Sequence, residues 1–205
     1  VNSFQAQKLV AADGPCASDV FKQYVGGAEL VRGSEGQCVI DLFGFSDSEI
    51  RYKYPEIYEY IIENVKPQRS IARDKQFREN WWVFGRNRPD LRQALAGTVR
   101  FIATTETAKH RLFQFINADV VPDHMVVSIA LSDGASLSVL SSRAHVVWSL
   151  ATGGWLGIGN DPRYSKSRCF DPYPFPDLTV AKRLSLASLG DELDATRKAV
   201  HANTN

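Results

Sequence analysis

Residues 99–131 read VRFIATTETAKHRLFQFINADVVPDHMVVSIAL, and this stretch decides the expected fold. Three apolar runs, at residues 99–104, 112–116 and 125–131, are rich in β-branched and aromatic side chains and are separated by polar segments. This pattern predicts three β-strands. Because residues 125–131 are apolar nearly throughout, we expect the third strand to be central.

Two long helices are predicted after these strands. Apolar residues recur at i, i+3, i+4 and i+7 over residues 135–151, which predicts one amphipathic helix. Its polar face would carry Ser138, Ser141, Ser142, His145 and Ser149. Three alternating prolines in residues 171–176 exclude a helix there, and a terminal helix is predicted over residues 178–201.

The remaining elements are shorter and complete the fold class. A mixture of strands and helices without a regular βαβ rhythm predicts an α+β fold, in which a mixed twisted β-sheet is flanked by helices and followed by a C-terminal helical arm. The expected short elements are a helix at residues 17–24, a strand at 38–43, a helix from Ser46 or Asp47 to Asn64 that Pro55 divides in two, helices at 67–80 and 89–96, and an irregular glycine-rich segment at 152–164.

The composition is that of a globular protein. The chain has 205 residues, of which 44% are hydrophobic and 23% charged, and its formal net charge is +1. No apolar run reaches the roughly 18 residues of a membrane span. Three distant cysteines, Cys16, Cys38 and Cys169, indicate a reducing compartment rather than a disulfide framework or a zinc site. The chain opens at Val1 without a methionine, so we expect it to be cut from a longer protein.

The small net charge conceals a segregation along the sequence. Residues 66–111 carry 11 basic and 4 acidic side chains, whereas residues 1–65 carry 5 basic and 10 acidic ones. A basic block of this size in a neutral chain suggests a localised anion-binding face. The alternative is that these charges are scattered over a solvated surface.

Catalytic motifs are absent from the sequence. The stretch GGWLGIG at residues 153–159 matches neither phosphate-loop pattern, and Trp155 would obstruct a pyrophosphate. The four histidines are separated and have no metal-ligand spacing. Ser141 and His145 share a helix face, but no carboxylate lies beside them to complete a nucleophilic triad.

Clusters of arginine, lysine and aromatic residues instead indicate a binding function. They lie in residues 81–92 (WWVFGRNRPDLR), 109–111 (KHR) and 163–168 (RYSKSR). Arginine and lysine on loops suit phosphate contacts, and the guanidinium fork also matches the O6 and N7 atoms of guanine. A solvated surface explains each cluster taken alone, but three of them together favour nucleic acid.

An ordered series of short motifs resembles a known family. The chain is similar to the target recognition domain of single-chain restriction–modification methyltransferases, the MmeI-like Type II (subtype L) group. The motifs are Asp41–Phe43, Val65-Lys66-Pro67-x-Arg69, Trp81–Trp82, Arg88-Pro89-x-Leu91-Arg92, Lys109-His110-Arg111-x-Phe113, Val139-Leu140-Ser141-Ser142-x-x-His145-x-x-Trp148, Arg163-Tyr164-x-x-Ser167-x-Cys169-Phe170 and Pro174-Phe175-Pro176.

The resemblance implies a division of labour within a longer bacterial, cytoplasmic protein. An adenine-N6 methyltransferase domain that uses S-adenosylmethionine, and a nuclease domain that would use Mg, precede the recognition domain in this family. Their motifs are missing here, so we expect this fragment to bind no cofactor and to catalyse nothing. Its partners would be double-stranded DNA and the methyltransferase domain of its own parent chain. Residues 1–177 would form the recognition domain, with 1–36 alternatively the tail of the methyltransferase region, and 178–205 the arm.

Residue type and position give the predicted contacts. Ser141, Ser142, His145, Trp148 and Phe170 are expected to hold the fold, and no catalytic or metal-binding residue is predicted. The alternative function is a protein-interaction or scaffold domain that reads no DNA. The predicted base contacts are Trp155, Arg163, Tyr164, Lys166 and Arg168, and the predicted phosphate contacts are Arg69, Arg86, Arg88, Arg92, Lys109 and Arg111.

Overall fold

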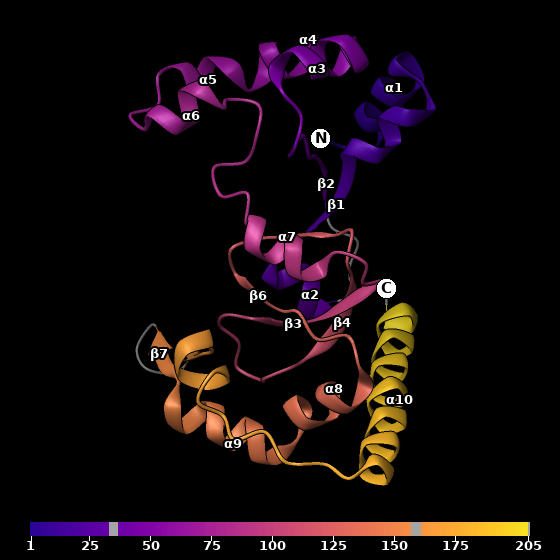
Figure 1. Ribbon diagram of the computed structural model, residues 1–205, viewed down its shortest axis with the longest axis vertical. Helices are drawn as coiled ribbons and strands as arrows, with labels where there is room; N and C mark the ends of the chain where they lie inside the picture. Colours follow the sequence, from indigo (N-terminus) through magenta and orange to yellow (C-terminus); the bar gives the residue numbers. More distant parts are fainter. Residues whose placement is uncertain (33–36, 157–160, 205) are drawn as a thin grey trace. The chain divides into compact units, whose positions relative to one another are not determined.

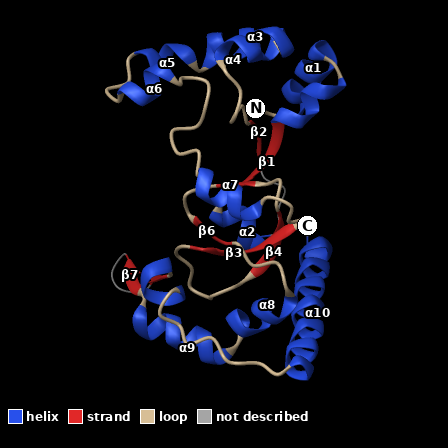
Figure 2. Cartoon of the chain, in the orientation of Figure 1, coloured by secondary structure: helices blue, strands red, loops and turns tan. Residues whose placement is uncertain are grey.

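The computed structural model describes residues 1–32, 37–156 and 161–204 (Figure 1). The chain divides into two compact units: unit 1 comprises Val1–Gln23 and Gln37–Pro89, and unit 2 comprises Tyr24–Gly36 and Asp90–Asn205. The α+β class is confirmed, with strands in three small sheets (Figure 2). The predicted division between residues 177 and 178 does not follow these units and stays a prediction of domain organisation. None of the described helices is long and apolar enough to span a membrane.

Unit 1 is mainly helical. Ser46 and Glu49 form a capping box at the start of α3, and Pro55 opens α4, as the sequence predicted. The predicted helix at residues 17–24 is wrong, because a 3₁₀ turn that begins at Pro15 gives way to a strand at Phe21. The elements are α1 (Ser3–Asp13), η1 (Pro15–Val20), the start of β1 (Phe21–Val25), β2 (Gln37–Ile40), α3 (Asp47–Lys53), α4 (Pro55–Asn64), α5 (Lys66–Ser70) and α6 (Lys75–Glu79).

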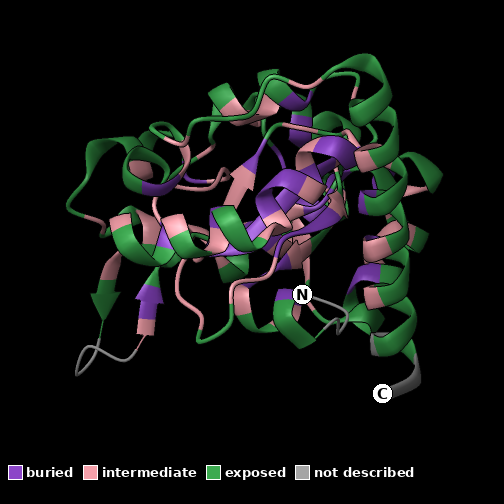
Figure 3. Ribbon diagram, turned by 90° about the horizontal axis from the view of Figure 1, so that it is seen from below, coloured by how far each residue is buried: buried purple, intermediate pink, exposed green. Residues whose placement is uncertain are grey.

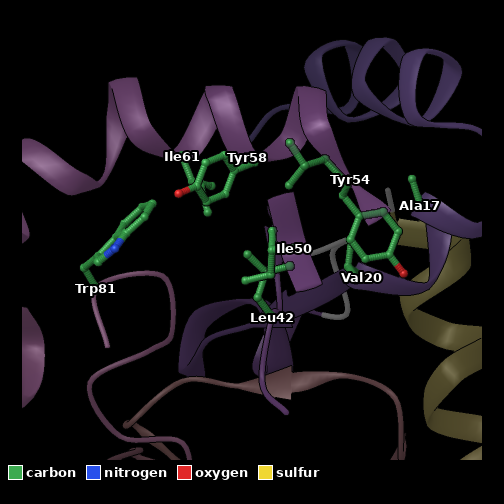
Figure 4. Close-up of a cluster of buried hydrophobic side chains, with 9 residues drawn as sticks. Ala17, Val20, Leu42, Ile50, Tyr54, Tyr58, Ile61 and Trp81 are labelled. Carbon is green, nitrogen blue, oxygen red and sulfur yellow. The ribbon is translucent and has the colours of Figure 1, made fainter. Parts of the chain in front are cut away.

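The core of unit 1 lies beneath α3 and α4 (Figure 4). Ile50, Ile57, Ile61 and Trp81 are buried together there. Tyr54 supplies no side-chain cap to α4, and Asp13 at the end of α1 takes this role instead. Its carboxylate oxygens accept hydrogen bonds from the backbone N–H groups of Glu56 and Ile57 at 2.9 and 2.8 Å. A cap contributed from so far away in sequence fixes α1 against α4.

Unit 2 is built on an antiparallel sheet with the order β4-β3-β6. Strand β3 (Arg100–Thr105) pairs with β4 (Gln114–Asn117) on one side and with β6 (Val126–Ile129) on the other. The prediction that residues 125–131 form the central strand is therefore wrong. The apolar side chains of β6 reflect the burial of both of its faces, but they do not show how many strands pair with it.

Alternate residues of β3 supply two hydrophobic clusters, one on each face of the sheet. Ile102 packs with residues of α8 (Gly134–Ser141). Phe101 and Ala103 pack with residues of α2 (Gly27–Arg32) and α7 (Pro89–Leu95). A short parallel pairing joins Tyr24 and Val25 of β1 to β5 (Val121–Pro122). Because successive side chains of β3 point to opposite faces and each face packs against a cluster, neither face of β3 is open to solvent.

The predicted helix at residues 135–151 is broken in two. Ser142 adopts an extended backbone (φ −65°, ψ 152°) and caps α9 (Arg143–Thr152) by accepting from the His145 N–H. The break rotates the second half, so the face that we predicted to be polar turns inward. His145 is fully buried, whereas Val147 is 56% exposed.

Helix α10 (Val180–Thr204) packs against α8 within unit 2. A Cβ atom on Gly190 would collide with the carbonyl oxygen of Gly134, so the two backbones touch without intervening side chains. The Ser138 hydroxyl donates to the Leu186 carbonyl at 2.6 Å across the same contact. Figure 3 shows most of α10 exposed, with a buried and half-buried stripe along its inner side.

Polar side chains of α10 also cover the edge of β4. Asp194 accepts from the Phe115 N–H at 2.8 Å, and Arg197 donates to the Phe113 carbonyl at 2.6 Å. Asp191 forms an ion pair with Arg100 at 2.7 Å. These contacts satisfy an edge strand that would otherwise expose its backbone, and they make the helix part of the unit 2 structure.

Gly190→Ala is expected to lower the free energy of unfolding by about 1–3 kcal/mol, because the added methyl group forces α8 and α10 apart. Urea denaturation measures the change. Ser188→Ala, at an exposed position of the same helix, is the control and should stay near the wild type. Equal stability of the two variants would contradict the close backbone contact.

Candidate nucleic-acid interface

A β-hairpin in unit 2 carries two of the predicted base contacts, Trp155 and Arg163, and the other three follow it in the chain. Strands β7 (Gly154–Leu156) and β8 (Asp161–Arg163) pair antiparallel, so the expectation of an irregular segment over residues 152–164 is wrong for these strands. The four residues 157–160 of that segment lie outside the described residues. Trp155 and Leu156 are 51% and 40% exposed. They place an aromatic and an aliphatic side chain on the surface of a two-stranded ribbon.

The segment after β3 fastens the base of this hairpin. The Tyr164 N–H donates to the Glu106 carbonyl at 2.7 Å, and the Ala108 N–H donates to the Pro162 carbonyl at 3.3 Å. Thr107 and Arg163 form a β-bridge between the same two segments. The predicted phosphate contact Lys109, which is exposed, therefore follows directly after the hairpin base.

Arg111, a predicted phosphate contact, is half-buried and already has partners within the fold, so its role at phosphate stays a prediction. Its Nη1 donates to the Thr105 carbonyl and its Nη2 to the Pro162 carbonyl at 3.1 Å, while the guanidinium carbon lies 5.1 Å from the ring centroid of Tyr164. Burial lowers the pKa of the Arg111 guanidinium, and the Tyr164 side chain partly opposes this shift. The side chain ties the end of β3 to β8 and is occupied within the fold.

Tyr164 was predicted to contact a base, and it is instead part of the core. It is 1% exposed and packs with Phe113 and His145, with its hydroxyl 3.3 Å from the Nε2 atom of His145. Burial strongly raises the pKa of the Tyr164 phenol, and the Cys169 side chain adds to the shift. The phenol is inaccessible to a DNA base in this structure.

His145 lies inside the fold, as predicted. Its Nδ1 atom is 2.8 Å from the Leu140 carbonyl, and the Trp148 Nε1–H donates to the Cys169 carbonyl at 3.1 Å. The Ser141 hydroxyl is buried and makes no hydrogen bond within the described structure. Both imidazole nitrogens of His145 thus face other groups, and Ser141 and His145 do not form a nucleophile and base.

The exposed cations of the hairpin region face carboxylates that sequence reasoning missed. Arg163 pairs with Glu106, and Lys166 pairs with Asp171 at 2.7 Å. Arg168 is exposed on the π-helical turn η2 (Lys166–Phe170). Glu106 could have been noticed because it is the single acidic residue in the range 91–118. A DNA group that binds Arg163 or Lys166 must compete with these carboxylates.

The other predicted phosphate contacts are distributed over both units. Arg69 in unit 1 has its guanidinium carbon 4.6 Å from the ring centroid of Phe77, and Arg86 and Arg88 of the same unit are exposed. Arg88 has a positive φ of 48°, which strains a side-chain-bearing residue. Arg92 is half-buried on α7 in unit 2. A single basic face formed from residues 66–111 stays a prediction.

The side chains that could bind a metal ion lie apart in the structure described. Within residues 1–32, 37–156 and 161–204, no group of three or more His, Cys, Asp or Glu side chains could hold a metal ion. The exposed groups that the structure describes include cations, carboxylates and apolar side chains.

This chain belongs to a family of target recognition domains. The family is described as "MmeI, target recognition domain", and its model matches residues 1–177. A DNA methyltransferase A from Bacillus subtilis (strain 168) is 24% identical over 172 residues, which cover 80% of this chain and 18% of that protein.

A solved structure shares the fold. It is the Type IIL restriction–modification enzyme MmeI in complex with DNA, with a TM-score of 0.74 and 18% sequence identity. The match covers 97% of this chain and 26% of the MmeI chain. This chain therefore spans about a quarter or less of the proteins that it matches.

Arg111→Lys is expected to reduce the free energy of unfolding by about 1–3 kcal/mol, because one ammonium group cannot reproduce the forked contacts to two carbonyls. Urea denaturation measures stability, and hydrogen exchange at the Tyr164 and Ala108 amides reports the hairpin base. Lys109→Gln, next to it and exposed, is the control. Unchanged exchange in Arg111→Lys would show that Arg111 does not hold the hairpin.

Stability is expected to fall as the pH drops below about 6.5, the ordinary histidine value. Burial lowers the pKa of His145, while its backbone hydrogen bonds oppose the shift. The unfolded chain therefore takes up the proton first, and the stability from the neutral ring is complete only above the unfolded pKa. Urea midpoints at about pH 7.5 and 5.5 should differ less in His145→Gln than in the wild type or in His110→Gln, an exposed control. Identical pH responses in all three proteins would contradict this assignment.

Proposed function

We propose that this chain reads a specific double-stranded DNA sequence for a larger adenine-N6 DNA methyltransferase, with or without a fused nuclease, and is itself non-catalytic. The observation that carries the proposal is the fastened β7–β8 hairpin in a chain of the MmeI target recognition family. A two-stranded ribbon is one of the shapes that the major groove admits.

The hairpin supplies chemistry suited to base edges. The Arg163 guanidinium can donate two parallel hydrogen bonds to guanine, and the exposed Trp155 and Leu156 can contact apolar groups such as a thymine methyl. Three further cations lie near β8. Lys166 and Arg168 follow β8 in the chain, and Lys109 follows the segment that is bonded to the hairpin base. Their charges suit phosphates as well as base edges. Glu106 orients Arg163 in the absence of DNA, and a base would take the place of the Glu106 carboxylate when DNA binds.

The missing chemistry is assigned to the rest of the parent protein. The matched relatives are named as a DNA methyltransferase and as a restriction–modification enzyme bound to DNA, and this chain spans only a small part of each. We assign S-adenosylmethionine to a methyltransferase domain of the parent, which would flip out the target adenine, and Mg to any nuclease domain. The methyltransferase domain is also the proposed protein partner, and the site of action is the bacterial cytoplasm.

The proposal is tested by fluorescence anisotropy with duplexes enriched from a random pool by the full chain. If about five basic residues meet phosphates, the slope of log K against log salt should be near −4.5. A flat salt response, or failure to enrich any sequence, would favour the protein-interaction alternative. Binding of S-adenosylmethionine by this chain, measured by calorimetry, would contradict its non-catalytic assignment.

Substitutions then separate base reading from phosphate binding. Arg163→Gln should relax the preference at one base pair by about 1–3 kcal/mol, because it removes a guanidinium fork from the hairpin. Arg88→Gln should weaken binding to all duplexes alike and make the salt slope shallower by about 1. Lys182→Gln, exposed on α10, is the control. Identical behaviour of the first two variants would show that the two roles are wrongly divided.

A further inference from the structure

We propose that residues 66–79 of unit 1, which form α5, α6 and the turn between them, bind the sugar–phosphate backbone of duplex DNA without reading its sequence. This cationic segment would supply much of the electrostatic attraction, while the hairpin in unit 2 supplies discrimination. The inference rests on the proposed function and assigns a separate task to unit 1.

The cationic segment concentrates positive charge in a small, ordered region. It contains Lys66, Arg69, Arg73, Lys75 and Arg78, against the two carboxylates of Asp74 and Glu79. The Asp74 side chain caps α6 by accepting from the Gln76 N–H at 2.9 Å, and Glu79 lies 3.4 Å from Lys75. The surplus of three positive charges therefore lies within two short helices that contact each other.

Three of these cations are held by groups that carry no charge. Lys66 Nζ lies 4.8 Å from the ring centroid of Trp81, and the Arg69 guanidinium lies over Phe77. Arg78 Nη1 donates to the carbonyls of Ala72 and Arg73 at 2.7 and 3.0 Å. A ring or a carbonyl orients a cation without cancelling its charge, so the field of the segment persists outside the protein.

The rings that orient the cations are themselves fixed. Trp81 is buried in the unit 1 core, and a Cβ atom at Gly85 would overlap the ring of Phe77. Gly85 thus leaves the space that the ring occupies. Cations that are ordered before binding lose less side-chain entropy when they meet a phosphate. Guanidinium groups also match phosphate oxygens in a bidentate geometry.

The cations of unit 2 differ in their partners. Five of the lysines and arginines in the described part of unit 2 pair with carboxylates, and this pairing reduces their long-range attraction for a polyanion. The pairs are Arg100–Asp191, Arg163–Glu106, Lys166–Asp171, Arg183–Asp133 and Lys198–Asp194. Duplex DNA carries one negative charge per about 1.7 Å, and cations attract it most strongly where no carboxylate offsets their charge. The cationic segment, where uncharged groups orient three of the cations, is therefore better suited to sequence-independent attraction than the paired cations of unit 2.

The test is the double variant Arg73→Gln/Lys75→Gln in the full chain, because both side chains are exposed and neither belongs to the hairpin. Anisotropy would be measured with a random-sequence duplex pool and with a duplex selected by the wild type. We expect affinity for both probes to fall on the order of tenfold at 0.1 M salt and the slope to become shallower by about 1.8. The ratio between the two affinities should stay unchanged.

The matched control is Lys8→Gln/Arg51→Gln, which removes the same charge from exposed positions of unit 1 outside the cationic segment. Equal losses in the two double variants, or an unchanged slope in Arg73→Gln/Lys75→Gln, would overturn the inference, as would a changed preference ratio. If the wild type bound all duplexes equally, the proposed reading function would be refuted. The salt slopes of the two double variants would then decide this inference. Absence of all DNA binding would refute both.

Discussion

The Arg111 guanidinium is a half-buried positive charge in unit 2, and its burial lowers its pKa. Carbonyl oxygens of Thr105 and Pro162 and the face of Tyr164 compensate for the lost water. These partners belong to β3 and to the segment at β8, which are far apart in sequence. This half-buried cation and the backbone hydrogen bonds of residues 106–108 therefore together hold the base of the β7–β8 hairpin. The exposed side chains of the hairpin depend on this internal tie, although none of them contributes to it.

Local signals in the sequence predicted several elements well. The Ser46 cap, the helix that Pro55 opens and the strands near residues 100–117 are determined mainly by neighbouring residues, and each was found with small errors at its ends. The failures involve tertiary choices. Ser142 can lie within a helix or cap the next one, and periodicity does not distinguish these states. Likewise, the apolar composition of β6 reports covered faces, and only the pairing itself shows that β6 lies at an edge.

The candidate site was predictable in its segments but not in the role of every residue. The sequence indicated residues 163–168 and 109–111, and the structure brings their neighbourhoods together, because backbone hydrogen bonds join Glu106 and Ala108 to Tyr164 and Pro162. It could not show that Tyr164 and Arg111 turn inward, because an arginine beside an aromatic residue occurs both on surfaces and in buried cation–π contacts. The pairing of Arg163 with Glu106 was also missed, since the two residues lie more than fifty positions apart in the chain.

Because α10 packs closely against α8, the helical register of α10 is fixed over part of its length. Gly190, Asp191, Asp194 and Arg197 lie on the side of α10 that faces the rest of unit 2, and each meets a different backbone or side-chain group. A single residue inserted before Gly190 would rotate every later contact by about 100°, which a helix cannot absorb without breaking. Changes of length within α10 up to Arg197 should therefore be rare in natural variants and destabilising when made by design.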